Sequence, residues 1–177
     1  MSTNFLINQS VLLILPAKDF NEQEFLIVKN ILERSQIKVF IASDSTSLCT
    51  GTDGLKVKND VQFYNIHDSN FRAIIFIGGK GVKNYWDNLG LRRIVKKFHS
   101  SQKPIGAICS AVLIPAKAGI IPGKATCWPE DKTELQKEGI EFIDEPVSVN
   151  KNIITGRDPQ AAAEFAKVFL HKLNEAG

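Results

Sequence analysis

The chain has 177 residues, of which 44% are hydrophobic and 23% are charged, a balance typical of a globular domain with a sizeable core. Its formal net charge of +3 is a mild excess without a block of lysines or arginines, so nucleic-acid binding is not indicated. No apolar run approaches the length that spans a membrane. We therefore predict one domain over residues 1–177, with neither a nucleic-acid nor a membrane partner.

The N-terminus and the cysteines favour a cytoplasmic protein. Residues 1–10 contain no lysine or arginine, and polar residues interrupt their apolar character, so they do not resemble a secretory signal. Cys49, Cys109 and Cys127 are widely spaced and form neither an even-numbered disulfide framework nor a metal-type pair. Cys49 lies in a polar stretch and is assigned no role. We expect reduced thiols, no metal and no cofactor.

Apolar strands alternate with helical patterns along the chain. The predicted strands cover residues 11–15, 37–42, 55–57, 61–63, 73–77, 105–108, 125–128, 141–143, 147–149 and 152–155, with a hairpin among the last three. The predicted helices cover residues 22–34, 91–99, 110–118, 129–138 and 159–173, and residues 43–54 are expected to form a loop. Because the strongest strands are uniformly apolar, the pattern indicates an α/β sandwich with a mostly parallel sheet.

A single cysteine separates the strand over 105–108 from the helix that begins at Ser110. A tight strand-to-helix turn of this kind is a nucleophile elbow, and small neighbours such as Gly106 and Ala111 allow it. A thiol at a helix N-terminus meets free N–H groups and the positive end of the helix dipole, which favour the thiolate. The same local pattern suits a small buried apolar cysteine equally well, so Cys109 has two possible roles at this point.

Open α/β sheets bind ligands outside the carboxyl ends of their strands. The turn after residues 11–15, the pair Gly78–Gly79 and Cys109 are therefore expected to meet. The backbone N–H groups of Gly78, Gly79 and Ser110 could form an oxyanion hole beside the thiol. The alternative is an ordinary glycine turn.

Two acids, Glu22 and Glu24, lie in the first turn of the helix over 22–34, which Asp19 or Asn21 could cap. Acids at this position usually complement the helix dipole. A carboxylate that pointed at a thiolate would form a like-charge pair, so the acid would stay protonated or share a proton. Such a carboxyl could act as a general acid and base.

Six segments, in order over residues 11–173, resemble the ThiJ/PfpI superfamily, also called the DJ-1 superfamily. They are Leu15–Glu24, Val39–Ser43, Ile77–Gly79, Ala107–Cys109, Thr126–Pro129 and Ile154–Pro159. The intracellular-protease-like PfpI branch is the most similar. The resemblance implies a flavodoxin-like three-layer sandwich and a homodimer. It also implies Cys109 as the nucleophile, Glu24 as the carboxyl bonded to its sulfur, and Gly79 and Ser110 as oxyanion donors.

Two family histidines are absent from this chain. Ser110 follows the cysteine where the PfpI branch has histidine, and Trp128 stands where the DJ-1 branch has one. Without a histidine base, a cysteine peptidase is disfavoured. We expect hydrolase or lyase chemistry through Cys109 on a small carbonyl or acyl substrate, of the glyoxalase, deglycase or amidase kind. The alternative is a redox-sensing or chaperone-like dimer in which Cys109 is oxidised.

Five residues are secondary site candidates: Glu22, Gly78, Trp128, Cys127 and Arg157. Glu22 replaces Glu24 if the helix register is displaced. Cys127 could resolve an oxidised Cys109, although the sequence favours a structural core cysteine. Arg157 could bind an anion, although a tie between the last loop and the core is favoured. The runner-up family, the class I glutamine amidotransferases, requires a His–Glu motif near the C-terminus that is absent here.

Overall fold

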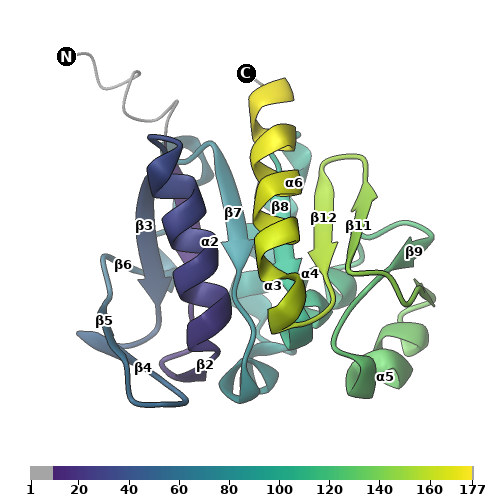
Figure 1. Cartoon of the computed structure of the whole chain (residues 1–177), viewed down its shortest axis with the longest axis horizontal. Helices are drawn as coiled ribbons and strands as arrows, with labels where there is room; N and C mark the ends of the chain where they lie inside the picture. Colours follow the sequence, from purple (N-terminus) through teal and green to yellow (C-terminus); the bar gives the residue numbers. More distant parts are fainter. Residues whose placement is uncertain (1–9, 177) are drawn as a thin grey trace.

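The computed structural model describes residues 10–176. The prediction that residues 1–10 are not a secretory signal therefore lies outside the described residues, apart from Ser10. A seven-stranded sheet carries helices on both faces (Figure 1). The strand order is β11-β12-β8-β7-β1-β3-β6, and every pairing is parallel except that of β11 with β12. The predicted α/β sandwich with a mostly parallel sheet is confirmed.

Within residues 10–176, the strands fall into three sheets. The main sheet contains β1 (Ser10–Ile14), β3 (Lys38–Ser43), β6 (Val61–Gln62), β7 (Ala73–Phe76), β8 (Ile105–Ile108), β11 (Val147–Asn150) and β12 (Ile153–Gly156). Two small sheets contain β2 (Lys18–Phe20), β4 (Leu48–Gly51) and β5 (Lys56–Lys58), and β9 (Lys124–Ala125) with β10 (Glu141–Phe142).

The helices are of two kinds. The α-helices are α2 (Glu22–Arg34), α3 (Leu89–Ser100), α4 (Leu113–Lys117), α5 (Lys132–Lys137) and α6 (Ala162–Glu175). The 3₁₀ turns are η1 (Phe63–Asn65), η2 (Asp68–Asn70), η3 (Lys80–Tyr85), η4 (Cys109–Val112), η5 (Pro129–Asp131) and η6 (Pro159–Ala161). Within the described part of the chain, none of these helices is both long and apolar enough to span a membrane.

The central strands are apolar throughout because each contributes to two apolar layers. In β1, Leu12 and Ile14 face the layer that contains side chains of α3 and α4. Val11 and Leu13 face the opposite layer, with side chains of α2 and α6. Figure 1 shows α2 and α6 together on one side of the sheet, with α3 and α4 behind it. Strands covered on both sides form the rigid base on which the loops at their carboxyl ends rest.

Helix α2 begins at the predicted residue. Asn21 caps it, since its side-chain oxygen accepts a hydrogen bond from the Glu24 N–H at 3.0 Å. The buried residues Phe25, Val28 and Leu32 belong to the same apolar layer as the side chains of α6. The capped first turn therefore fixes Glu24, whose side chain is fully buried, beside Gly78 in the loop after β7.

Several stretches differ from the prediction. Strand β2 and the turn η3 were not expected, and the helices expected over 129–138 and 159–173 each begin with a 3₁₀ turn, η5 and η6. Two further differences concern the site. The expected loop over 43–54 contains β4, in which exposed and buried residues alternate and backbone groups pair with β2 and β5. Cys49 is consequently fully buried in a strand rather than placed on a loop. The helix expected over 110–118 is the turn η4 followed by the five-residue α4, which contains Pro115.

The packing of α6 predicts a large effect for one core residue. Phe165 is fully buried, with 0% of its surface accessible to solvent, and its ring lies against Gly106 of β8. We expect Phe165→Ala to lower the free energy of unfolding by about 3–5 kcal/mol, because the lost contacts leave a cavity. Tyr64→Ala, at a side chain that is 82% exposed, is the control and should change it by less than about 0.5 kcal/mol. Urea denaturation measures both, and equal effects would contradict the described packing.

Candidate active site

Cys109 lies at the sharp turn between β8 and η4. Its φ is 61°, in the left-handed region that residues with a side chain seldom adopt. Such strain persists only where the surrounding structure holds it. The residue is 7% exposed and lines a pocket of about 570 Å³. The chain therefore has the strained strand-to-helix turn that a nucleophile elbow requires.

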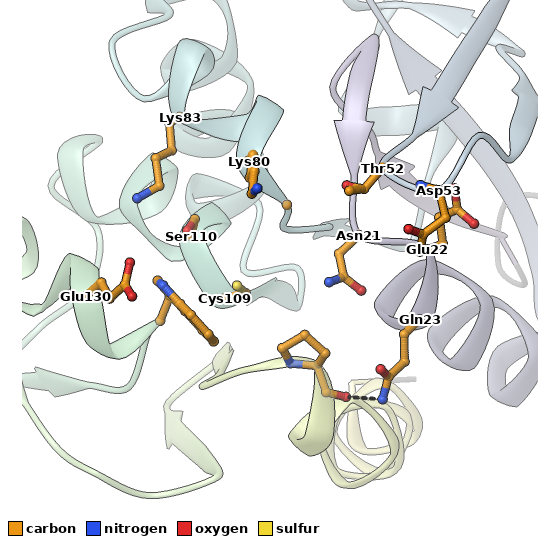
Figure 2. Close-up of a pocket in the computed structure, with 13 residues that line it drawn as sticks. Asn21, Glu22, Gln23, Thr52, Asp53, Lys80, Lys83, Cys109, Ser110 and Glu130 are labelled. Atoms are coloured by element: carbon orange, nitrogen blue, oxygen red, sulfur yellow. Dashed lines mark hydrogen bonds between the residues drawn. The ribbon is translucent and has the colours of Figure 1, made fainter.

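The pocket lies outside the carboxyl ends of β1, β7 and β8. The three segments expected to meet there do so, since Asn21, Gly79 and Cys109 all line it. Figure 2 shows Cys109 and Ser110 on one side of the cavity, with Asn21, Thr52 and other α2-side residues across from them. This position, between strands whose connections run in opposite directions, is where open α/β sheets bind ligands.

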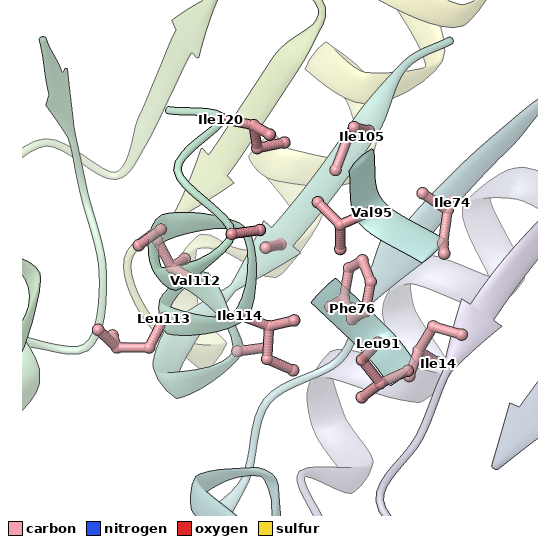
Figure 3. Close-up of a cluster of buried hydrophobic side chains, with 14 of the residues drawn as sticks. Ile14, Ile74, Phe76, Leu91, Val95, Ile105, Val112, Leu113, Ile114 and Ile120 are labelled. Carbon is pink, nitrogen blue, oxygen red and sulfur yellow. The ribbon is translucent and has the colours of Figure 1, made fainter. Parts of the chain in front are cut away.

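The apolar layer beneath the pocket holds the elbow in place (Figure 3). Val112, Leu113 and Ile114 follow the cysteine, and all three are fully buried. Their layer includes Phe76 of β7 and Leu91 of α3. Burial of these side chains supplies the stabilisation that offsets the strained backbone at the turn.

Glu24 lies next to Cys109 and is fully buried. Its Oε2 accepts a hydrogen bond from the Gly78 N–H at 2.8 Å, and its carboxyl interacts with the Cys109 thiol. Oε1 is buried and has no hydrogen-bonding nitrogen or oxygen partner among residues 10–176. A Cβ at Gly78 would come within 2.7 Å of both Glu24 and Cys109, so glycine is required there. Because its N–H is bound to Glu24, Gly78 does not supply the oxyanion donor considered from the sequence.

Burial controls the protonation of this pair. It raises the pKa of Glu24 from its usual 4.5 to about 8, so the carboxyl is mostly protonated at pH 7. Burial also raises the pKa of the Cys109 thiol, and the charge of an ionised Glu24 raises it further. The Ser110 N–H lowers it, which is the effect expected of a helix start, but that effect is outweighed. Two groups in such contact titrate as one pair.

Gly79 brings its backbone to the pocket wall. Its φ is 118°, and a Cβ there would lie 2.4 Å from the Asp19 carbonyl oxygen and 2.5 Å from the Asn21 nitrogen. Only glycine fits this close approach. Gly79 and Ser110 line the same pocket as Cys109, so the two expected oxyanion donors are brought together with the thiol.

A polar network beside Cys109 has no counterpart in the sequence analysis. Ser110 Oγ donates a hydrogen bond to Asp131 Oδ2 at 2.5 Å, and Lys83 Nζ lies 2.5 Å from Asp131 Oδ1. Trp86 Nε1 donates to the Ser110 carbonyl at 2.7 Å. Asp131 is only 2% exposed, so it forms a largely buried link between η3, η4 and η5. In the sequence, Asp131 is marked only by its place in the first turn of a predicted helix, and an acid there is explained equally well by the helix dipole.

The family model for the DJ-1/PfpI family matches residues 9–172 of this chain. The chain belongs to the DJ-1/PfpI family. A glutathione-independent glyoxalase of Caenorhabditis elegans is 28% identical over 93% of this chain and 89% of its own length. A deglycase of Pyrococcus horikoshii is 29% identical over 91% and 98%. The crystal structure of a ThiJ/PfpI domain protein from Brachyspira murdochii has a TM-score of 0.92 at 27% identity, covering 94% and 97%.

The two acids of α2 have separate positions in this DJ-1/PfpI site. Glu22 lines the pocket, but its Oε1 accepts hydrogen bonds from the N–H groups of Asp53 at 2.9 Å and Leu55 at 2.8 Å. Glu22 therefore holds the loop after β4, and Glu24 is the acid at the cysteine. The register inferred from the family resemblance agrees with the structure.

The other secondary candidates have structural positions, apart from Trp128, which lines the pocket. Cys127 is fully buried, its sulfur donates to the Trp128 carbonyl at 3.3 Å, and burial raises its pKa to about 12. Both facts favour a core cysteine over a resolving thiol. Arg157 binds Asp144, which is 74% exposed, at 2.9 Å and its neighbour Asp158 at 2.7 Å, so it joins the loop after β12 to the loop before β11 rather than to the core.

The raised pKa of Glu24 predicts a pH-dependent stability. Between its usual value of 4.5 and about 8, the folded chain binds a proton that the unfolded chain has lost. The stabilisation that this proton provides is complete below pH 4.5 and is lost as the pH rises to about 8. The free energy of unfolding falls over this range by up to about 1.4 kcal/mol per pH unit. Relative to wild type, Glu24→Gln should show a flatter decline in the free energy of unfolding. Glu33→Gln, on the exposed face of α2, is the control. Identical wild-type and Glu24→Gln profiles in urea would contradict the assignment.

Proposed function

We propose that this protein is a cysteine-dependent enzyme that converts small 2-oxoaldehydes to 2-hydroxy acids. The observation that carries the proposal is the enclosed pair of Glu24 and Cys109 at the pocket, with a carboxyl whose pKa lies close to the working pH. Relatives named as a glyoxalase and as deglycases support carbonyl chemistry of this class.

The reaction begins when the pair of Glu24 and Cys109 has lost one proton, so that the Glu24 carboxylate faces the Cys109 thiol. The sulfur of Cys109 forms a bond to the aldehyde carbon, C1, and the C=O π electrons move to the oxygen, where the N–H groups of Gly79 and Ser110 stabilise the charge. Glu24 accepts the thiol proton and delivers it to this oxyanion. The product of this stage is a hemithioacetal.

The second stage moves hydrogen within the substrate. The Glu24 carboxylate removes the proton from C1, and the electron pair of the C1–H bond forms an enediolate whose charge lies on the C2 oxygen. The C1 hydroxyl then passes its proton to the C2 oxygen, Glu24 returns its proton to C2, and the C1 oxygen regains its double bond to C1. C1 is thereby oxidised and C2 reduced, and the product is a thioester of a 2-hydroxy acid. Water cleaves the thioester and restores the Cys109 thiol, so the step needs no external oxidant or reductant.

A peptidase function has less support at this site. Ser110 Oγ donates to Asp131, and Trp128 has no group that titrates as a base. The three histidines, His67, His99 and His171, all lie in the described part of the chain, and none lines the pocket. Homodimer formation and a cytoplasmic location stay predictions.

An assay with methylglyoxal tests the proposal, with the 2-hydroxy acid product measured directly. We expect turnover to disappear in Cys109→Ala and to fall at least about 100-fold in Glu24→Gln, since general acid–base catalysis contributes that much. Below about pH 8, kcat/KM should rise with pH, because Glu24 must lose its proton before it can accept one. Cys127→Ala, at a buried cysteine outside the pocket lining, is the control and should retain activity.

Product formation that is equal in wild type and Cys109→Ala would contradict the proposal. Absence of turnover together with clean conversion of Cys109 to a sulfinic acid under mild peroxide would instead favour the redox-sensing alternative.

A further inference from the structure

We propose that Lys83 forms an anion subsite beside Cys109, which binds the oxygen next to the reacting carbonyl of a small 2-oxo substrate. The inference rests on the proposed function and names the substrate feature that the site recognises: a carboxylate, or the enediolate oxygen that develops at C2. A 2-oxoaldehyde supplies this oxygen and a simple aldehyde does not.

The position of Lys83 is the first observation. Lys83 lies in η3, which follows Gly79, and it lines the pocket together with Cys109 and Ser110. Figure 2 shows its amino group directed toward the part of the cavity between Ser110 and Glu130. The side chain is 42% exposed, so its charge is accessible from the pocket.

The second observation is that this ammonium is held in place and still has donors to offer. Nζ binds Asp131 Oδ1 at 2.5 Å and lies 5.2 Å from the centre of the Trp86 ring. Asp131 is itself held by the Ser110 hydroxyl. An ammonium carries three N–H donors, and Asp131 is the one acceptor that residues 10–176 provide. The remaining N–H groups can bind a ligand without first ordering a flexible side chain.

The other charges around the pocket limit the ligand to a small one. Lys80 lies on the same side as Lys83, whereas Glu130 is an acid beside it (Figure 2). Glu22 and Asp53 lie across the cavity, on the α2 side. A long polyanion would meet these acids, whereas a single anionic oxygen on the side of Lys83 and Ser110 would not.

The chemistry of the proposed reaction gives this cation a role. When Glu24 takes the C1 proton, negative charge develops at the C2 oxygen, and a fixed cation there stabilises the transition state more than the neutral substrate. Ser110 and Trp128, which line the same pocket, supply no positive charge. Lys83 provides that charge from a different element, η3.

Two alkylating reagents of similar size test the subsite without any need for turnover. Iodoacetate is an anion and iodoacetamide is neutral, and peptide mass spectrometry measures the modification rate at Cys109 for each. We expect the ratio of the iodoacetate rate to the iodoacetamide rate to fall roughly threefold to tenfold in Lys83→Met at low salt, as expected for one partly solvated unit charge. Lys83→Arg should keep most of the ratio. Lys80→Met is the matched control and should change it less than twofold.

The variant Lys83→Met leaves the Asp131 carboxylate without its cation, so Lys83→Met combined with Asp131→Asn is measured as well. This double variant removes both charges together and should show a smaller fall in the same direction, because the repulsion from Asp131 is lost together with the attraction and the N–H donors of Lys83. An unchanged ratio in folded Lys83→Met, or an equal fall in Lys80→Met, would overturn the inference. Loss of the proposed function has a different signature: no 2-hydroxy acid is formed while the dependence of the ratio on Lys83 persists.

Discussion

The contact between the buried Glu24 carboxyl and the Cys109 thiol constrains the whole carboxyl end of the sheet. An isolated carboxylate in an apolar interior costs many kcal/mol, so the chain keeps this group protonated and gives one of its oxygens to the Gly78 N–H. That arrangement requires glycine at 78, a capped start of α2, and a turn at the end of β8 that brings the sulfur over the carboxyl. Three elements from different parts of the chain are therefore fixed relative to one another by one acid.

A second buried carboxylate fixes the rim of the same site. Asp131 joins the Ser110 hydroxyl to the Lys83 ammonium and so connects three short 3₁₀ turns that have little stability of their own. Asp131 is buried although Lys83 is 42% exposed, so removing the cation would leave a buried carboxylate with the Ser110 hydroxyl as its remaining partner among the described residues. The pocket thus combines a neutral acid beside the sulfur with a cation at the wall. Both match the needs of the proposed reaction, in which a proton moves and negative charge develops on oxygen.

Local patterns in the sequence predicted the elements that support this site. Helix α2 and strand β8 were located to the residue, because caps and periodicity mark the first and uniform apolar character marks the second. Strand β4 was missed because it is short and lies within a stretch rich in serine, threonine, aspartate and glycine, and only pairing with β2 and β5 makes it a strand. Cys49 was misplaced for the same reason.

The site itself required more than local pattern. Glu22 and Glu24 lie about 200° apart around the helix axis, so only one can face the thiol, and the family resemblance rather than the periodicity selected Glu24. Lys83 and Asp131 are 48 positions apart and belong to no motif, so their pairing appears only in the folded chain. The sequence correctly indicated that the N–H group at the helix start lowers the pKa of the Cys109 thiol. Burial raises that pKa by more, and the burial of Cys109 depends on tertiary packing that local sequence does not reveal.

The rate of Cys109 alkylation by iodoacetamide as a function of pH, in wild type and in Glu24→Gln, tests the central claim most directly. If the two groups share their protons, the wild-type rate rises with pH and bends near pH 8, where Glu24 ionises, and this bend is absent from Glu24→Gln. Profiles of the same shape in both proteins would mean that the carboxyl does not control the thiol, and the account of this site would be wrong.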